Sequence, residues 1–303
     1  MVLSFILGVN NCWAAKRFVE PEEWIKIAAT ELEVSYVQFS FDVLDPGVDT
    51  PAIDRIISRT LDYCSDYGVK IHSCFTGLAA YSYNLLLHPD SVMRQKATEW
   101  YEKALTLAAK LKAEAAGGFL GAFSVRDFRN EERRHLLLSS LIETLKYLSQ
   151  VGKKHGLKYL LWEPMPISRE PPATIEEAKD LLSQVNEESA IPIKLCLDVG
   201  HVCNPHAKDA MNRDPYMWLK FLGKDSPCIH IQQTDGKADR HWPFTEEYNK
   251  VGIIEGEKVL SALRESGTDL VYLFLEVIHP FEYPDGQVIK EIKASVNYWK
   301  SYL

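Results

Sequence analysis

Four short apolar runs in the second half of the sequence each lead into an acidic residue or a histidine. The runs Tyr-Leu-Leu-Trp, Leu-Cys-Leu, Cys-Ile and Leu-Phe-Leu precede Glu163, Asp198, His230 and Glu276, in that order. If these runs are strands, side chains two positions apart share a face, so each polar residue continues an apolar face. Three carboxylates buried together repel one another strongly unless a cation lies between them. The pattern therefore predicts a bound divalent metal ion, provided that the four strands converge.

The types of ligand narrow the choice of metal. Carboxylate oxygens together with one imidazole nitrogen favour a fairly hard ion such as Mn²⁺, Mg²⁺ or Co²⁺, while Zn²⁺ stays open. His201 stands three residues after Asp198 and therefore beyond the strand. At that place it can donate to a substrate, bind a second metal ion or cap the next element.

To position these residues, the fold must repeat strands along the whole chain. Short apolar runs alternate throughout with longer stretches of helical periodicity. Gly68, Gly156 and Gly267 directly follow three of the helical stretches, where a left-handed cap is least costly for glycine. The predicted strands are 3–12, 36–41, 70–76, 115–122, 158–165, 193–199, 228–233 and 272–278. The predicted helices include 21–30, 51–67, 91–111, 131–155, 175–186, 256–265 and 288–302.

Eight strand and helix units without a linker predict an α/β fold, a single parallel (β/α)8 TIM barrel domain over residues 1–303. A doubly wound sheet is the alternative, but no G-x-G-x-x-G follows a strand. Gly117, Gly118 and Gly121 have the wrong spacing for a dinucleotide loop, and close packing in a barrel wall explains them better. A barrel carries its catalytic groups at the C-terminal ends of its strands, where the four polar residues stand.

Charge and composition argue against several classes of function. The chain has 34 Lys and Arg against 42 Asp and Glu, and its formal net charge of −8 opposes binding to nucleic acid. No apolar run reaches the roughly 18 residues needed to span a membrane. The six cysteines form no C-x-x-C pair, which favours reduced thiols in a cytoplasmic protein. Residues 2–9 are apolar but lack the charged start of a secretory signal.

The ordered set resembles the site of the xylose-isomerase-like barrel superfamily, in particular its sugar and sugar-phosphate epimerases and isomerases related to the ketose 3-epimerases. In that branch a Glu, an Asp, a His and a Glu at the ends of strands 5 to 8 hold one divalent metal ion. The resemblance implies that Glu163, Asp198, His230 and Glu276 are the metal ligands. It also implies that Glu163 and Glu276 act as acid and base, and that His201 contacts a small carbohydrate substrate. Members of the family are often dimers or tetramers, so the resemblance also allows a homo-oligomer.

One position departs from the family pattern. Ketose 3-epimerases usually carry an Arg six residues after the strand-7 His, and here that position is Gly236. The same loop offers Lys237, Arg240 and His241 instead, and we expect these three to hold the far end of the substrate, a phosphate in particular. The loop after strand 7 is one of the places where barrels commonly bind phosphate.

Other residues near strand ends are further candidates for substrate binding. Glu170, seven residues after Glu163, corresponds to a substrate-binding Glu of the family, and His72 at the end of strand 3 and Asn10 in strand 1 are further polar candidates. Segments 76–81 and 241–244 resemble a subgroup that acts on short ketose phosphates, such as tetrulose phosphates, and on branched sugars. Aromatic residues just beyond strand ends are expected to wall the pocket: Trp13, Phe75, Tyr81 and Trp242.

The reaction expected from such a site is proton transfer at a carbon next to a carbonyl. The enediolate must be stabilised as it forms, which a divalent metal ion can do. Two carboxylates on opposite sides of a sugar can take a proton from one face and return one to the other, which inverts the centre. Return of the proton to the adjacent carbon gives aldose–ketose isomerisation instead. The sequence leaves both reactions open.

Three other functions are alternatives. A decarboxylase or dehydratase of an oxo-sugar acid would use the same metal-stabilised chemistry. Abasic-site endonucleases share this barrel and need extra ligands, for which His201, His72 and the pair Asp239 and His241 are candidates. Strand 4 offers no His for that set, and the net charge opposes DNA binding. The third alternative, a barrel that only binds a ligand, is disfavoured because all four predicted metal ligands are present.

Overall fold

The strands close into the predicted barrel. The computed structural model describes residues 4–48, 50–203, 207 and 209–303, and within them eight parallel strands follow one another around a closed barrel, with the last paired to the first. The (β/α)8 topology is therefore confirmed. The strands are shorter than predicted: β1 (Ser4–Asn10), β2 (Tyr36–Ser40), β3 (Lys70–Phe75), β4 (Ala115–Gly118), β5 (Tyr159–Trp162), β6 (Ile193–Asp198), β7 (Cys228–Ile231) and β8 (Leu270–Leu275).

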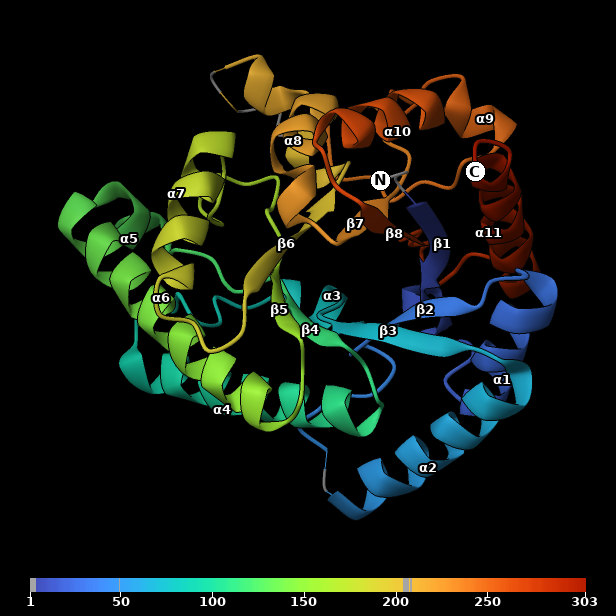
Figure 1. Ribbon diagram of the computed structural model, residues 1–303, viewed down its shortest axis with the longest axis horizontal. Helices are drawn as coiled ribbons and strands as arrows, with labels where there is room; N and C mark the ends of the chain where they lie inside the picture. The colour runs from blue at the N-terminus through green and yellow to red at the C-terminus, as the bar shows by residue number, and fades with distance from the viewer. Residues whose placement is uncertain (1–3, 49, 204–206, 208) are drawn as a thin grey trace.

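Helices form an outer ring around the strands (Figure 1). The long helices match the predicted ones, and Gly68, Gly156 and Gly267 adopt φ angles of 68°, 81° and 74° after α2, α6 and α10, which confirms their predicted role as left-handed caps. The helices are α1 (Pro21–Lys26), which continues as a wider turn over Ile27–Glu31, α2 (Thr50–Tyr67), α3 (Leu78–Tyr81), α4 (Ser91–Lys110), α5 (Val125–Arg129), α6 (Glu131–Lys154), α7 (Ile175–Asn186), α8 (Pro215–Leu222), α9 (Glu246–Asn249), α10 (Gly256–Glu265) and α11 (Asp285–Lys300).

The barrel interior is apolar directly below the predicted metal ligands. Every predicted ligand continues the inward face of its strand, because the residue two positions before it lies in the interior cluster. This layer leaves little room for water under the polar groups, so their mutual electrostatic interactions are strong. The interior cluster consists of Phe75, Ala115, Leu161, Cys196, Cys228 and Phe274.

The glycines of β4 serve close packing, as predicted. A Cβ atom added to Gly117 would lie 1.9 Å from the carbonyl oxygen of Leu161, and one added to Gly118 would lie 2.0 Å from Oγ1 of Thr76. Both neighbours belong to the barrel wall or to the loop that follows it. The glycines therefore let adjacent strands approach and do not form a phosphate-binding loop.

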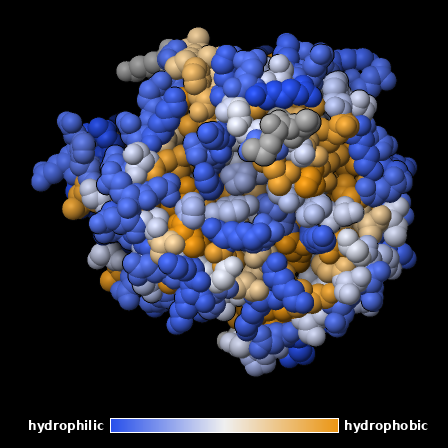
Figure 2. All heavy atoms as spheres, viewed as in Figure 1, coloured by the Kyte–Doolittle hydropathy of each residue, from blue (hydrophilic) through white to orange (hydrophobic). Residues whose placement is uncertain are grey.

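The visible surface in Figure 2 is dominated by hydrophilic side chains, with smaller hydrophobic groups scattered between them. In the part of the chain that the structure describes, no helix is both long enough and apolar enough to cross a bilayer.

Candidate metal centre and active site

The four predicted metal ligands meet at the C-terminal end of the barrel. Glu163 and Glu276 directly follow β5 and β8, Asp198 ends β6, and His230 lies within β7. One oxygen or nitrogen atom from each of the four side chains lies within 4.8 Å of the others, and all four residues are buried. This spacing and this donor set suit a divalent cation held by three carboxylates and one imidazole.

His230 is at the centre of this group. Its Nδ1 atom lies 3.0 Å from Oε1 of Glu163, 3.0 Å from Oε2 of Glu276 and 3.9 Å from Oδ2 of Asp198. Among the described residues, Oε2 of Glu276 has no hydrogen-bond donor although it is buried. A buried carboxylate oxygen without a donor is costly, so the residues fit a cation at this place.

The two glutamates differ in their electrostatic surroundings. Burial raises the pKa of Glu276 above its ordinary value, and the attraction of His230 offsets only part of this effect. Burial would also raise the pKa of Glu163, but His201 and His230 together hold it below its ordinary value. Two carboxyl groups with opposite pKa shifts at one site are typical of an acid and a base.

The first two strands orient the imidazole of His230. Its Nε2 atom contacts the side-chain oxygen of Gln38, which also accepts a 2.9 Å hydrogen bond from Asn10. Asn10 further donates to Oε1 of Glu276 at 2.8 Å, and the amide nitrogen of Gln38 donates to Ser73 at 3.1 Å. Sequence reasoning missed Gln38. Its signal was a polar residue inside the apolar run 36–41, the same kind of interruption that marks the predicted metal ligands.

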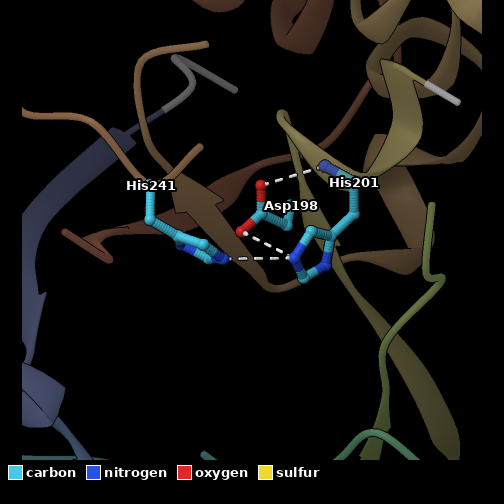
Figure 3. Close-up of side chains that lie close together, drawn as sticks. All are labelled: Asp198, His201 and His241. Atoms are coloured by element: carbon cyan, nitrogen blue, oxygen red, sulfur yellow. Dashed lines mark hydrogen bonds and ion pairs between the residues drawn. The ribbon is translucent and has the colours of Figure 1, made fainter. Parts of the chain in front are cut away.

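A second group lies beside the first and shares Asp198 with it. Figure 3 shows the imidazoles of His201 and His241 pointing toward one another next to the Asp198 carboxylate. Their Nε2 atoms are 3.4 Å apart, and Nε2 of His201 is 3.9 Å from Oδ2 of Asp198. Oδ2 of Asp239 lies 3.2 Å from Nε2 of each histidine. The predicted site residues His201 and His241 are thus brought to the centre, in a group that could hold a second cation or a shared proton.

The carboxylates around the two histidines favour their charged forms. Burial lowers the pKa of His201, but Asp198, Asp239 and Glu163 outweigh it and raise the pKa well above the ordinary value. Burial also lowers the pKa of His241, but the charge of Asp239 outweighs burial and raises the pKa to about 9.

Gln232 is a second site residue that sequence reasoning missed. Its amide nitrogen donates at 3.0 Å to both Asp198 and Asp239, and its oxygen accepts from the backbone N–H of His241. A Cβ atom at Gly200 would lie 2.4 Å from the Gln232 side chain, so the glycine makes room for it. Gln232 therefore ties the loop after β7 to the end of β6.

Glu170 also lies close to the second group. It is 8% exposed, and burial raises its pKa to about 7, while the charges of Arg169, His201 and Asp239 also act on it. A carboxyl group at this place can bind a sugar hydroxyl, and the role of Glu170 in substrate binding stays a prediction.

The structure corrects the placement of His72. His72 is the third residue of β3, near the N-terminal end of the barrel, and its Nε2 atom lies 3.1 Å from the hydroxyl of Tyr159. Its ring packs against Tyr272 with centroids 4.0 Å apart. His72 therefore lies in the barrel interior below the predicted metal ligands, with its Nδ1 atom 3.6 Å from Sγ of Cys228. It cannot bind the substrate there or supply the extra ligand that an endonuclease would need.

The cations of the β7 loop are arranged differently from His241. Arg240 donates two hydrogen bonds to Asp235, at 3.0 and 2.9 Å, and its guanidinium lies 5.0 Å from the ring centroid of Trp242. Lys237 is exposed and forms no salt bridge within the described residues. Of the three predicted anchor residues, only His241 joins the central groups.

The comparisons with known proteins agree with this arrangement. The family model of the xylose isomerase-like TIM barrel matches residues 27–302. A D-erythrulose 1-phosphate 3-epimerase from Brucella abortus (strain 2308) is 29% identical over 306 residues, which cover 99% of this chain and 97% of that protein.

Solved structures resemble the whole barrel. A protein of Rhodospirillum rubrum ATCC 11170, provisionally described as a xylose isomerase, is 30% identical with a TM-score of 0.91, over 98% of this chain and 99% of the other. D-Psicose 3-epimerase from Clostridium cellulolyticum H10, solved with D-tagatose, has a TM-score of 0.71 at 16% identity, over 98% of each chain. Because the family model covers most of its length, the chain belongs to the xylose isomerase-like TIM barrel family.

Proposed function

We propose that this protein is a metal-dependent epimerase that inverts the carbon next to the carbonyl of a ketose or ketose phosphate. One observation carries the proposal: Glu163 and Glu276 come from β5 and β8, which flank β6 and β7, and each places an oxygen 3.0 Å from Nδ1 of His230. Two carboxylates that converge from two sides on a ligand centre suit removal of a proton on one face and return on the other.

The residues Glu163, Asp198, His230 and Glu276 would hold the metal ion, which we expect to be Mn²⁺, Mg²⁺ or Co²⁺, with Zn²⁺ as a further candidate. When bound, such an ion supplies Lewis-acid stabilisation of the negative charge that develops on the carbonyl oxygen. Glu163 and Glu276 hold and move the proton at their carboxylate oxygens. His201, His241 and Glu170 offer polar groups beside them for the substrate hydroxyls.

A short ketose phosphate is the substrate class that the comparisons favour. The Brucella relative is an epimerase of D-erythrulose 1-phosphate at carbon 3, which is the carbon next to the carbonyl. The structural neighbours include 3-epimerases of longer ketoses. We therefore propose a tetrulose phosphate as the first substrate to test. Isomerisation is the second candidate, because the same two carboxylates can return the proton to the neighbouring carbon.

The test begins with metal content. Elemental analysis of the purified protein should find one divalent metal ion per chain, and Asp198→Asn and His230→Ala should lose it while the fold survives. Asp209→Asn, an exposed residue outside the site, is the control and should keep its metal. Undiminished metal in both site variants contradicts the proposed centre.

The reaction is tested in heavy water. D-Erythrulose 1-phosphate, its free ketose and longer ketoses are incubated with the enzyme; polarimetry or chiral chromatography follows the configuration, and NMR follows the deuterium label. An epimerase converts D- to L-erythrulose 1-phosphate with deuterium at carbon 3. An aldose product from a free ketose favours the isomerase, whereas a ketose 1-phosphate cannot give one because its C1 oxygen carries the phosphate. Transfer of the substrate hydrogen without solvent label contradicts the two-carboxylate mechanism.

A further inference from the structure

Tyr81 reaches Glu163 from the segment after β3, which supplies none of the four predicted metal ligands. Its hydroxyl donates a 2.8 Å hydrogen bond to Oε2 of Glu163. The other oxygen, Oε1, lies 3.0 Å from Nδ1 of His230. The last torsion of a glutamate side chain has broad minima, so contacts at both oxygens decide its orientation. Tyr81 provides the contact at Oε2, while Nδ1 of His201 also lies 3.5 Å from Oε1.

The helical turn that carries Tyr81 is fixed at its start. The backbone N–H groups of Leu78 and Ala79 donate to the carboxylate of Asp42 at 2.6 and 3.2 Å. A Cβ atom at Gly77 would lie 2.2 Å from Oδ2 of Asp42, so this approach requires a glycine. Asp42 follows β2, and α3 is therefore attached to the barrel wall by a side chain.

The chain after Tyr81 is fixed as well. The side chain of Asn84 donates to the carbonyl of Ala122 at 2.6 Å, and the backbone N–H of Leu86 donates to the carbonyl of Leu120 at 3.1 Å. The ring of Tyr81 packs edge-on against Phe119 with centroids 5.3 Å apart. The segment is thus fixed both before and after Tyr81, so the hydroxyl is already oriented before a ligand binds.

We propose that Tyr81 is a positioning residue whose hydrogen bond to Oε2 sets the orientation of Glu163, with Oε1 directed at the ligand cluster. The catalytic part of this inference rests on the proposed function, because Glu163 is there both a metal ligand and a proton-transfer group. Its effect on metal binding needs no turnover. Loss of a group that orients a metal ligand typically costs about 10- to 100-fold in metal affinity or activity.

The experiment removes only the hydroxyl. Tyr81→Phe keeps the ring against Phe119, and titration of metal-free protein with Mn²⁺ alone measures the affinity. We expect about 10- to 100-fold weaker binding than in the wild type. Tyr83→Phe is the matched control, because Tyr83 lies two residues further along and is 64% exposed. Unchanged Mn²⁺ affinity in Tyr81→Phe overturns the inference, and so does an equal loss in Tyr83→Phe.

A second variant separates positioning from general loosening. Asp42→Ala removes the attachment of α3 but keeps the Tyr81 hydroxyl, so it should weaken Mn²⁺ binding less. The double variant should be no weaker than Tyr81→Phe, because both changes act through the same hydrogen bond. Fully additive losses overturn the proposed connection from Asp42 through Tyr81 to Glu163.

Turnover then distinguishes this inference from the proposed function. With an active substrate, Tyr81→Phe should lower kcat at saturating Mn²⁺ and leave KM nearly unchanged, since the substrate's own contacts are kept. If the wild type binds Mn²⁺ but converts none of the ketoses or ketose phosphates, the proposed function fails. The Mn²⁺ titration still decides the role of Tyr81 in that case.

Discussion

His230 contacts the side-chain oxygen of Gln38 through Nε2, which leaves Nδ1 as the ring atom that faces Glu163 and Glu276. The direction of the contact follows from its neighbours. The Gln38 oxygen also accepts from Asn10, and its amide nitrogen donates to Ser73. The Gln38 oxygen is therefore the acceptor, and Nε2 of His230 carries a hydrogen.

We predict that Gln38→Leu weakens Mn²⁺ binding by about 10- to 100-fold, because the imidazole loses its partner and its fixed orientation. Titration of metal-free protein measures this. Gln95→Leu on the exposed side of α4 is the control and should bind Mn²⁺ like the wild type. Equal affinities in all three proteins would mean that other contacts orient His230.

Glu276→Gln should lower kcat by at least the factor of roughly 10² to 10⁴ that is typical of a general acid or base. The amide can still accept the hydrogen bond from Asn10 but cannot take up the substrate proton. The measurements are kcat and the rate of deuterium uptake at the reacting carbon in heavy water. Glu265→Gln, half exposed at the end of α10, should change neither rate. A loss below about tenfold would exclude Glu276 from proton transfer.

Arg240 and Lys237 should differ in their effect on a phosphorylated substrate. Arg240 is already neutralised by two hydrogen bonds to Asp235, so Arg240→Ala should change the preference for a ketose phosphate over its free ketose only slightly. Lys237 is exposed in the same loop, and Lys237→Ala should lower kcat/KM selectively for the phosphate. The expected loss is about 10- to 100-fold if one charge-assisted hydrogen bond of about 1.5–3 kcal/mol is removed. A selective loss in Arg240→Ala alone would reverse these roles.

His72 should make the fold sensitive to mild acid. Burial lowers the pKa of His72 from 6.5 to about 4, so the folded protein keeps it neutral while the unfolded chain protonates near pH 6.5. Its contribution to stability is present above pH 6.5 and is lost as the pH falls toward 4, by on the order of 3 kcal/mol. His72→Gln should flatten this part of the curve of unfolding temperature against pH. His135→Gln, whose side chain is 72% exposed, should follow the wild type. Parallel curves for His72→Gln and the wild type would contradict the prediction.

The sequence predicts the barrel and the strands that carry the predicted metal ligands, because both depend on local periodicity. Period-two alternation places Leu161 and Glu163, or Cys196 and Asp198, on one face whatever the rest of the chain does. Parallel strands that follow one another around a barrel then bring their C-terminal ends together. The four-residue cluster is the direct result of these two rules.

Other parts of the site depend on pairings between distant segments, which no local pattern contains. Tyr81 meets Glu163 across 82 positions, and His230 meets Gln38 across 192. The misplacement of His72 has a simpler cause, because it is already the third residue of the predicted strand 70–76. The register of β3 against β2 is a further pairing of this kind. Val37 pairs with Ile71 but Gln38 pairs with Ser73, so β3 holds one extra residue at His72. Such a bulge leaves no mark in the alternation of the sequence.

The hydrogen bond from Asn10 to Glu276 crosses the seam where the last strand meets the first. All four predicted metal ligands lie in or directly after β5 through β8, whereas Asn10 and Gln38 come from β1 and β2. A half-barrel made of the last four strands would therefore contain all four predicted metal ligands. It would lack Asn10 and Gln38, which orient Glu276 and His230. A circular permutant that starts at β5 would keep the six contributing strands consecutive along the chain. In this protein, barrel closure is also the step that completes the site.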